Sequence, residues 1–319
     1  MKQLEDLPDE LIQNVLNSLE LPDLLSCGLV SKRIRSVSFI ESLWQKIDIS
    51  NSGHSRKIVP SDLVKRIINR GCKSLSLRGC KITEDINHSN FSLELNQTKM
   101  DTCQLISLDL TNCIVKQSVM NVLLTACHSL KNLSLRNVAL TPFMFEIICN
   151  PNGQTLQTLK LTFSYGTSMY IFPSEMMLIV TKCVRLREVD FSGCRLSKNC
   201  VEILVNNISQ NVEKLGLDGP GIHAEDKHIV ALVSRCKKLT SLNLAYGEKL
   251  TDISLTSIIL NLKFTLEELD IGCCRLITHT KLLEMRVMPK LKTVCYGISR
   301  NFHELKKTLP QLTRRKEII

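Results

Sequence analysis

The side chains best able to do chemistry in this sequence are its cysteines, of which there are fourteen. Clustered thiolates could hold a metal ion, and an activated thiol could act as a nucleophile. Many of these cysteines, however, recur at two places in a repeating pattern, either just after a short apolar run or just before it: Cys80, Cys113, Cys194 and Cys274, and Cys72, Cys127, Cys183 and Cys236. The Cys-x-x-Cys spacing that zinc sites favour does not occur. We therefore predict reduced cysteines that are buried as small apolar side chains.

No other arrangement of residues matches a catalytic motif. The sequence has no Gly-x-Gly-x-x-Gly, no phosphate-binding Gly-Lys-Ser/Thr loop, no His-Glu-x-x-His and no Gly-x-Ser-x-Gly. His223 and His228, with Glu225 and Asp226 between them, fit a polar loop and a helix start better than a ligand set. A reactive-cysteine ligase would need an exposed thiol in an electropositive setting. We predict a non-catalytic protein without catalytic, cofactor-binding or metal-binding residues.

The net charge of +10 raises the question of a nucleic acid or an acidic membrane as partner. The charge is spread along the chain and is concentrated only near its end, without interleaved aromatic residues for base stacking, at Lys306, Lys307, Arg314, Arg315 and Lys316. The acidic residues 1–10 do not resemble a signal peptide, and no run of about 18 apolar residues is present. We expect a soluble protein of the nucleus, the cytoplasm or both, with no nucleic acid and no membrane among its partners.

A sequence repeat must position these residues. The pattern Leu-x-x-Leu-x-Leu-x-x-Cys runs down the chain, and its last strand position falls at Leu77, Leu110, Leu135, Leu161, Phe191, Leu217, Leu244, Ile271 and Tyr296. Successive positions differ by 33, 25, 26, 30, 26, 27, 27 and 25 residues, a period typical of solenoids. We predict an α/β fold in which residues 63–298 form a leucine-rich-repeat horseshoe.

Two periodicities explain how one repeat folds. The Leu-x-Leu core places both leucines on one face of a short strand, whereas residues 227–233 have the spacing of an amphipathic helix. Neither element can bury its apolar side alone, so repeats must stack on their neighbours. Ser197 and Thr251 are predicted to begin helices because their side-chain oxygens can cap free backbone N–H groups.

Residues 5–48 differ from the repeats. Leu7-Pro8-Asp9-Glu10-Leu11 leads into an amphipathic helix, Leu21-Pro22-Asp23-Leu24-Leu25 begins a second one, and Glu41-Ser42-Leu43-Trp44 closes the segment with the only tryptophan. About forty-four residues bury little by themselves and usually need a partner or a neighbouring domain. We expect a helical module, a linker at 49–62 and a short basic tail at 299–319. An ordinary helical cap on the repeat array, which would bury Leu11, Val15 and Leu25, is the alternative.

The order of these motifs resembles the F-box, and with the cysteine-bearing repeats the whole chain resembles the F-box and leucine-rich-repeat family. The resemblance implies a substrate-recognition subunit of an SCF-type ubiquitin ligase. Its F-box would bind a Skp-type adaptor, and through it cullin and RING subunits, while its repeats would bind a protein substrate, for which the family suggests a phosphorylated cell-cycle regulator. The resemblance assigns to adaptor binding Leu7, Pro8, Leu11, Ile12, Val15, Leu16, Leu24, Leu25, Val30, Leu43 and Trp44. A scaffold that never delivers a substrate for ubiquitination is the alternative.

Polar residues beside the strand leucines should face the concave side of such a horseshoe. They comprise early basic and later acidic or amide positions, and we assign to substrate binding Arg78, Asp109, Arg136, Lys160, Glu188, Asp190, Asp218, Asn243 and Asp270. An acidic or phosphorylated peptide segment would lie toward the arginines. The alternative is that strand positions facing water are simply polar.

One part of the family's function is not expected here. Members that recruit a Cks-type phosphate-reading accessory carry large or charged residues at strand positions that we align with Gly193, Gly221, Tyr246 and Cys273. At these positions the sequence departs from that pattern, so recruitment of a Cks-type accessory is doubtful.

Overall fold

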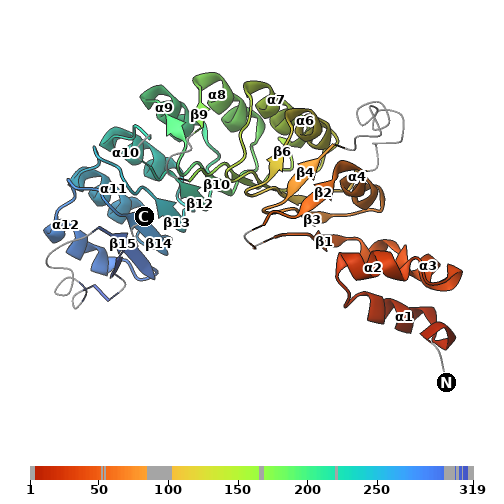
Figure 1. Ribbon diagram of the computed structural model, residues 1–319. Helices are drawn as coiled ribbons and strands as arrows, with labels where there is room; N and C mark the ends of the chain where they lie inside the picture. Colours follow the sequence, from red (N-terminus) through yellow and green to blue (C-terminus); the bar gives the residue numbers. More distant parts are fainter. Residues whose placement is uncertain are drawn as a thin grey trace. The chain divides into compact units, whose positions relative to one another are not determined.

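The computed structural model describes residues 4–51, 53, 55–84, 103–164, 169–219 and 222–297, together with 306, 309–310 and 312–314 (Figure 1). The chain forms two compact units, Met1–Leu133 and Ser134–Ile319, which are described separately. No helix among the described residues is long and apolar enough to cross a membrane. The same residues contain no group of three or more His, Cys, Asp and Glu side chains that could hold a metal ion.

The first unit begins with a helical module. Its elements are η1 (Leu4–Asp6), α1 (Asp9–Leu16), α2 (Leu21–Cys27), α3 (Lys32–Ser38) and η2 (Glu41–Leu43). Proline at position 8 precedes the first turn of α1, and the Ser31 side chain caps α3 by accepting a hydrogen bond from the N–H of Ile34 at 3.2 Å. The indole Nε1 of Trp44 donates to the carbonyl of Ser38 at 2.8 Å, so this buried ring is bonded to the end of α3.

The repeats of the first unit start earlier than predicted. Their elements are β1 (Lys46–Asp48), β2 (Ile58–Pro60), α4 (Ser61–Asn69), β3 (Ser74–Ser76), β4 (Lys81–Thr83), β5 (Ser107–Asp109), β6 (Ile114–Val115), α6 (Gln117–Thr125) and β7 (Asn132–Ser134), the last crossing the unit boundary. Strands β1, β3 and β5 pair in parallel, and so do β2, β4 and β6. The predicted linker at 49–62 is therefore wrong, because it contains β2 and the start of α4.

The second unit continues the alternation of strands and helices. Its elements are α7 (Pro142–Asn152), β8 (Thr158–Lys160), β9 (Tyr170–Ile171), α8 (Pro173–Lys182), β10 (Glu188–Asp190), β11 (Arg195–Leu196), α9 (Lys198–Asn207), β12 (Lys214–Gly216), α10 (Asp226–Arg235), β13 (Ser241–Asn243), α11 (Asp252–Leu262), β14 (Glu268–Ile271), α12 (His279–Leu283), η4 (Glu284–Val287), β15 (Thr293–Tyr296) and β16 (Leu312–Arg314). Strands β8, β10 and β12 to β16 form one parallel sheet. Helices α7 to α11 all lie on one side of this sheet (Figure 1). The predicted solenoid of repeats is confirmed.

The core of this unit is a row of aliphatic side chains in register across the sheet. One buried residue from the centre of each strand lies beside the next, in the order Leu159, Val189, Leu215, Leu242, Leu269 and Val294. Burying such a side chain contributes roughly 1.5–3 kcal/mol, so each repeat is stabilised mainly by its neighbours. The predicted helix caps are confirmed, since Ser197 accepts from the N–H of Cys200 and Thr251 from that of Ile253, both at 3.2 Å.

A turn with one left-handed residue follows the strands. Gly193, Tyr246 and Cys273 have φ values of 77°, 61° and 63°. A side chain at Gly193 would place Cβ 2.0 Å from the carbonyl oxygen of Phe163, so only glycine fits this close approach. These three residues lie beyond the ends of their strands, so their predicted strand positions are wrong, and Gly221 lies outside the described residues.

The cysteines after the strands connect adjacent repeats. The Sγ of Cys194 donates to the carbonyl of Leu161 at 2.8 Å, and that of Cys274 donates to Leu244 at 3.3 Å. All eight recurring cysteines of the two predicted places are buried and form no disulfide, as predicted. Burial raises the pKa of Cys113 to about 12, which keeps this thiol protonated and unreactive at neutral pH.

The end of the chain departs from the predicted basic tail. Residues 312–314 form β16, which pairs in parallel with β15 and extends the sheet, so part of the predicted tail is a strand. Leu309, just before β16, is buried. Of the basic tail residues, Lys307, Arg315 and Lys316 lie outside the described residues.

Candidate protein-binding surfaces

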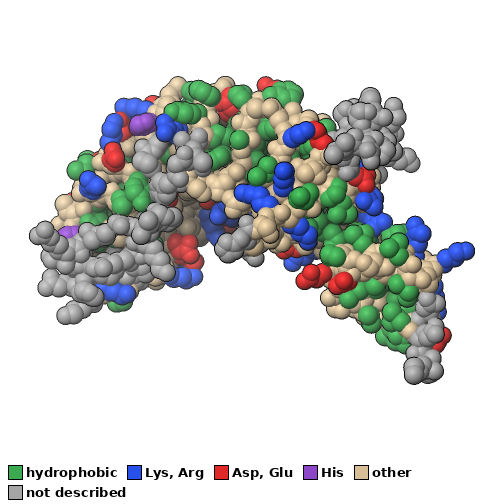
Figure 2. All heavy atoms as spheres, in the orientation of Figure 1, with side chains coloured by type: hydrophobic (Ala, Val, Ile, Leu, Met, Phe, Trp, Pro, Cys, Tyr) green, Lys and Arg blue, Asp and Glu red, His purple; other side chains and the backbone are tan. Residues whose placement is uncertain are grey.

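The helical module exposes large apolar side chains at two places. On α1 the side chains of Leu11 and Val15 are 48% and 44% exposed, and in the turn after α2 those of Leu29 and Val30 are 85% and 67% exposed. Figure 2 shows hydrophobic side chains gathered over this module. Exposed apolar groups of this size are typical of a protein-binding surface. Burial of Leu11 and Val15, which a simple repeat cap requires, is not found.

The predicted adaptor-binding residues divide into two groups. Pro8 is exposed and Leu7 and Leu25 are half-buried, so these three, like Leu11, Val15 and Val30, can be reached by a partner. The others are at most 7% exposed and form the core of the module: Ile12, Leu16, Leu24, Leu43 and Trp44. These five side chains hold the helices together, and their assignment to adaptor binding stays a prediction. Leu29 was missed, although an apolar residue beside Val30 and after Gly28 was the available signal.

Arg33 fixes the helix that carries part of this surface. Its Nη2 donates to the carbonyl of Leu7 at 2.8 Å and to Oδ1 of Asp9 at 3.0 Å, and its Nε donates to the same carboxylate oxygen at 3.2 Å. This fork ties the start of α1 to α3. The arginine therefore sets the direction of α1, and with it the positions of Leu11 and Val15.

In the first unit, the polar strand residues pair with each other. The guanidinium of Arg78 lies 3.2 Å from the carboxylate of Asp109 on the neighbouring strand. Asp109 also accepts a hydrogen bond from the N–H of Thr111 at 2.8 Å, which closes the turn after β5. One carboxylate thus serves both the turn and the ion pair, and Arg78 remains largely exposed on this face.

In the second unit, the predicted separation of basic from acidic residues is replaced by ion pairs between strands. Arg136 lies 3.5 Å from Asp190, and Lys160 lies 2.6 Å from Glu188. Asp190 also accepts from the N–H of Ser192 at 3.1 Å. The distance between Arg136 and Asp190 exceeds the about 2.7–2.9 Å that is usual for a charge-assisted hydrogen bond. Asp190 therefore binds this guanidinium only weakly.

The later predicted residues have structural roles. Asn243 accepts from the N–H of Ala245 at 3.2 Å and Asp270 from that of Gly272 at 2.9 Å, so each closes a turn within its own repeat. Asp218 is buried, and its carbonyl accepts from the N–H of Gly193 at 2.6 Å. Of these three residues only Asp218 is buried, whereas Asn243 and Asp270 are half-buried, as are Arg136 and Lys160.

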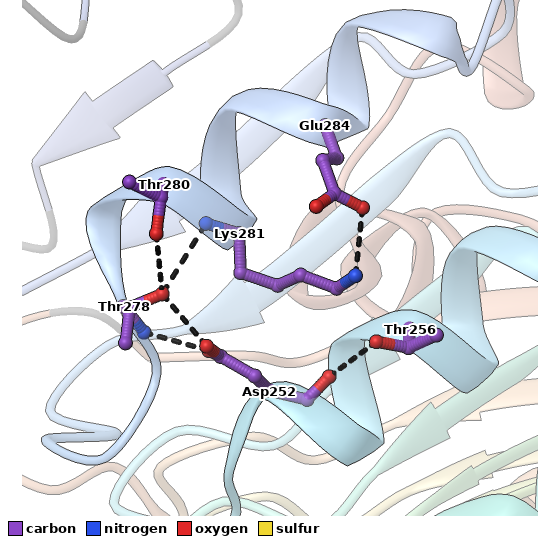
Figure 3. Close-up of polar contacts among 6 residues, drawn as sticks. All are labelled: Asp252, Thr256, Thr278, Thr280, Lys281 and Glu284. Atoms are coloured by element: carbon purple, nitrogen blue, oxygen red, sulfur yellow. Dashed lines mark hydrogen bonds and ion pairs between the residues drawn. The ribbon is translucent and has the colours of Figure 1, made fainter.

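A ladder of hydrogen bonds joins the starts of successive helices at the edge of the second unit. Asp252 begins α11 and accepts from the N–H and the Oγ1 of Thr278, both at 2.7 Å, while Thr278 caps α12 (Figure 3). One repeat earlier, Asp226 makes the same contacts with Thr251, at 2.9 and 2.6 Å. Burial raises the pKa of Asp226, but the hydrogen bonds it accepts, from Ser254 and from Thr251, outweigh this and lower it overall.

Two titratable side chains stand out from their repeats. A hydrogen bond from the Cys127 thiol lowers the pKa of Cys103, which is half-buried rather than fully buried. His228 is buried in the first turn of α10, and its Nδ1 accepts the N–H of Glu225 at 2.9 Å within a reciprocal cap; the predicted helix start near these residues is confirmed. Its Nε2 has no partner among the described residues.

Comparison with known proteins gives two family matches. Residues 89–317 match the family described as the SKP2 LRR domain, and residues 4–50 match the F-box-like family. Among solved structures, the chain resembles one from the Rad7 and Elc1 complex in yeast with 13% identity and a TM-score of 0.51, covering 96% of this chain and 92% of that one. It also resembles the leucine-rich-repeat-containing protein LegL7 from Legionella pneumophila with 15% identity and a TM-score of 0.44, covering 84% of this chain and 89% of that one. At such low identity, the likeness to Rad7 supports the fold alone.

Proposed function

This chain belongs to the leucine-rich-repeat F-box proteins of the SKP2 type, and on that basis we propose that it is the substrate-recognition subunit of an SCF-type ubiquitin ligase. An F-box-like domain followed by SKP2-type repeats indicates such a receptor. This domain architecture is typical of non-catalytic subunits. In this proposal the helical module binds a Skp-type adaptor, and through it cullin and RING subunits. The repeats hold a target near a separately recruited ubiquitin-charged enzyme and accelerate transfer by proximity.

The observation that carries this proposal is the exposure of Leu11 and Val15. A module that only capped the repeats would turn these side chains inward, whereas here the core is filled by Ile12 and Leu16. Removing two large apolar side chains from water gives about 1.5–3 kcal/mol each when a partner covers them. The exposed pair thus supports an adaptor as the partner of this face.

The target segment is proposed to bind the strands of the second unit near Arg136. Because the distance from Arg136 to Asp190 is long, a phosphate or carboxylate of the target can replace Asp190 as the better partner of this guanidinium. A phosphorylated cell-cycle regulator, degraded in the nucleus or the cytoplasm, fits this chemistry and the family likeness. A negatively charged target segment is the feature that the geometry supports.

Binding of a purified Skp-type adaptor tests the first half of the proposal. The double variant Leu11→Ala, Val15→Ala should bind at least tenfold more weakly than the wild-type chain, since buried apolar anchors dominate such interfaces. The matched control is Ile253→Ala, Leu260→Ala, which removes exposed side chains of the same kind from α11 and should leave the affinity unchanged. If both double variants bound the adaptor with the same affinity, the helical module would be only a cap on the repeats.

Ubiquitination of captured proteins tests the second half. The chain would be assembled with adaptor, cullin and RING subunits, and proteins retained by the wild-type repeats would be followed by mass spectrometry for ubiquitin attachment. Transfer that depends on the repeats supports the receptor. Capture without any transfer would instead identify a scaffold that binds partners without delivering them.

A further inference from the structure

Three arginines from two helices gather beside the aromatic residues at the end of the helical module. The guanidinium carbon of Arg70, at the end of α4, lies 4.0 Å from the ring centroid of Trp44 and 4.2 Å from that of Phe39. Arg35 of α3 lies over the same Phe39 ring at 5.6 Å. Arg66, one turn before Arg70 on α4, completes the cluster, which lies entirely within the first unit.

The cluster is electrostatically unfavourable as it stands. Burial, and then the charges of Arg66 and Arg35, lower the pKa of Arg70 from its ordinary value. Arg66 has a carboxylate partner in Asp62 at 2.9 Å. Arg35 and Arg70 have none among the described residues, and the carboxylate of Glu41, which packs against Gly71, makes no ion pair with either of them. Two guanidinium groups thus share one ring without an anion.

Stacking prepares Arg70 for a particular kind of partner. A guanidinium that lies over two rings loses much of its conformational freedom before any partner arrives, which reduces the entropy cost of binding. A guanidinium can also donate two N–H groups side by side to the two oxygens of a carboxylate. Arg35 is exposed beside it and can bind the same or an adjacent carboxylate.

We infer that Arg35, Arg66 and Arg70 form a docking site for a carboxylate-bearing segment of the adaptor, which therefore contacts α4 as well as the helical module. This inference rests on the proposed adaptor binding. The F-box-like match ends at residue 50, so Arg66 and Arg70 lie outside it, whereas Arg35, Phe39 and Trp44 lie within it. The partner's carboxylates neutralise the like charges that crowd the Phe39 ring, so the cluster changes from a cost to a source of affinity on binding.

The affinity of the full-length chain for a purified Skp-type adaptor, measured at low and at high salt, tests the inference. Arg35→Ala and Arg70→Ala should each weaken binding by roughly threefold to tenfold at low salt, and both should reduce the dependence of affinity on salt. Arg70→Lys keeps the charge but loses the planar donor pair, so its affinity should lie between those of Arg70→Ala and the wild type. The matched control, Lys81→Ala, removes one exposed positive charge that is not among those acting on Arg70 and should change neither quantity.

The outcomes separate this inference from the proposed function. Wild-type binding that is lost in the Leu11→Ala, Val15→Ala variant but is unchanged in both arginine variants would support the adaptor and overturn the arginine site. Loss of thermal stability in Arg70→Ala, with Arg35→Ala binding as well as Lys81→Ala, would assign the cluster to packing alone. No adaptor binding by the folded wild-type chain would overturn both proposals.

Discussion

At the scale of single residues, burial has turned the most reactive side chain types into structural ones. Cys194 and Cys274 each donate to a carbonyl of the preceding repeat. His228 is used in the same way, because its Nδ1 accepts a backbone N–H at the start of α10 and must be unprotonated to do so. The two thiols thus connect neighbouring repeats, and the imidazole stabilises a helix start within its own repeat.

The first prediction concerns the pH dependence of stability at His228. Burial, followed by the charge of Lys227, lowers the pKa of this imidazole below its ordinary value, against the opposite influence of Glu225 and Glu202 and with a further small lowering by Lys198. A depressed folded-state pKa means that the neutral form is favoured by folding. The stabilisation is therefore fully present above the unfolded-state pKa of about 6.5 and is lost as the pH falls below it.

Urea unfolding midpoints from neutral to mildly acidic pH measure this effect. The wild-type midpoint should fall with pH more steeply than that of His228→Gln, which keeps a side-chain acceptor for the N–H of Glu225 but cannot titrate. His223→Gln, at an exposed position on the loop before α10, is the control and should follow the wild type. Parallel curves for wild type and His228→Gln would show that His228 does not govern the acid sensitivity.

At the level of elements, the starts of α11 and α12 are each held by a side chain of the helix before them. Asp226 and Asp252 occupy equivalent first positions in α10 and α11, and each binds the threonine that caps the next helix. The acidic side chain also suits the positive end of its own helix dipole. Stability thus passes between neighbouring repeats through polar contacts at the edge as well as through the leucine core.

The second prediction compares these two aspartates. Asp226→Ala should cost about 2–3 kcal/mol, because it removes the contacts to Thr251 and leaves the buried Ser254 without its acceptor. Asp252→Ala should cost only about 1 kcal/mol, since its partner Thr278 is exposed and can bond to water. Chemical denaturation of both variants measures the difference. A larger loss for Asp252→Ala would contradict the role assigned to burial here.

At the scale of the whole molecule, the two proposed binding surfaces belong to different units. The apolar surface on α1 and after α2 belongs to the first unit, and the charged strand surface around Arg136 belongs to the second. A receptor needs two such surfaces with separate partners, so changes in one should leave the other's partner in place. This independence is what distinguishes a receptor from a protein with a single interface.

The third prediction tests that independence on the second unit. Arg136→Glu should reduce capture of target proteins by about tenfold, because it repels the negatively charged segment proposed to bind there. Arg187→Glu, which breaks the nearby pair of Arg187 with Glu213 at 3.1 Å, is the matched control and should retain them. Quantitative mass spectrometry of co-purified proteins gives the comparison, with adaptor binding expected to be unchanged in both. If the Arg136 variant retained its targets, the strand residues around Arg136 would only face water and would not bind the target.

The repeat, its strands and its helix caps could be predicted from the sequence, because these features depend on local spacing. The Leu-x-Leu periodicity places two leucines on one strand face wherever the strand lies, and Ser197 and Thr251 cap helices through contacts with residues two or three positions away. Burial of the recurring cysteines followed from the same period. Membership of the F-box and leucine-rich-repeat family was predicted from the order of motifs and confirmed by the family matches.

Which side chains reach a surface depends instead on how the elements pack against one another. Leu11 and Ile12 are adjacent apolar residues, yet one is 48% exposed and the other fully buried, because the packing of α1 on α3 selects the inner face. Arg136 contacts Asp190, which lies 54 residues later in the sequence. The strand β16 pairs with β15, although the sequence between them does not show the repeat pattern. Such contacts depend on the register in which distant segments stack, and that register is set by the whole chain and not by local spacing.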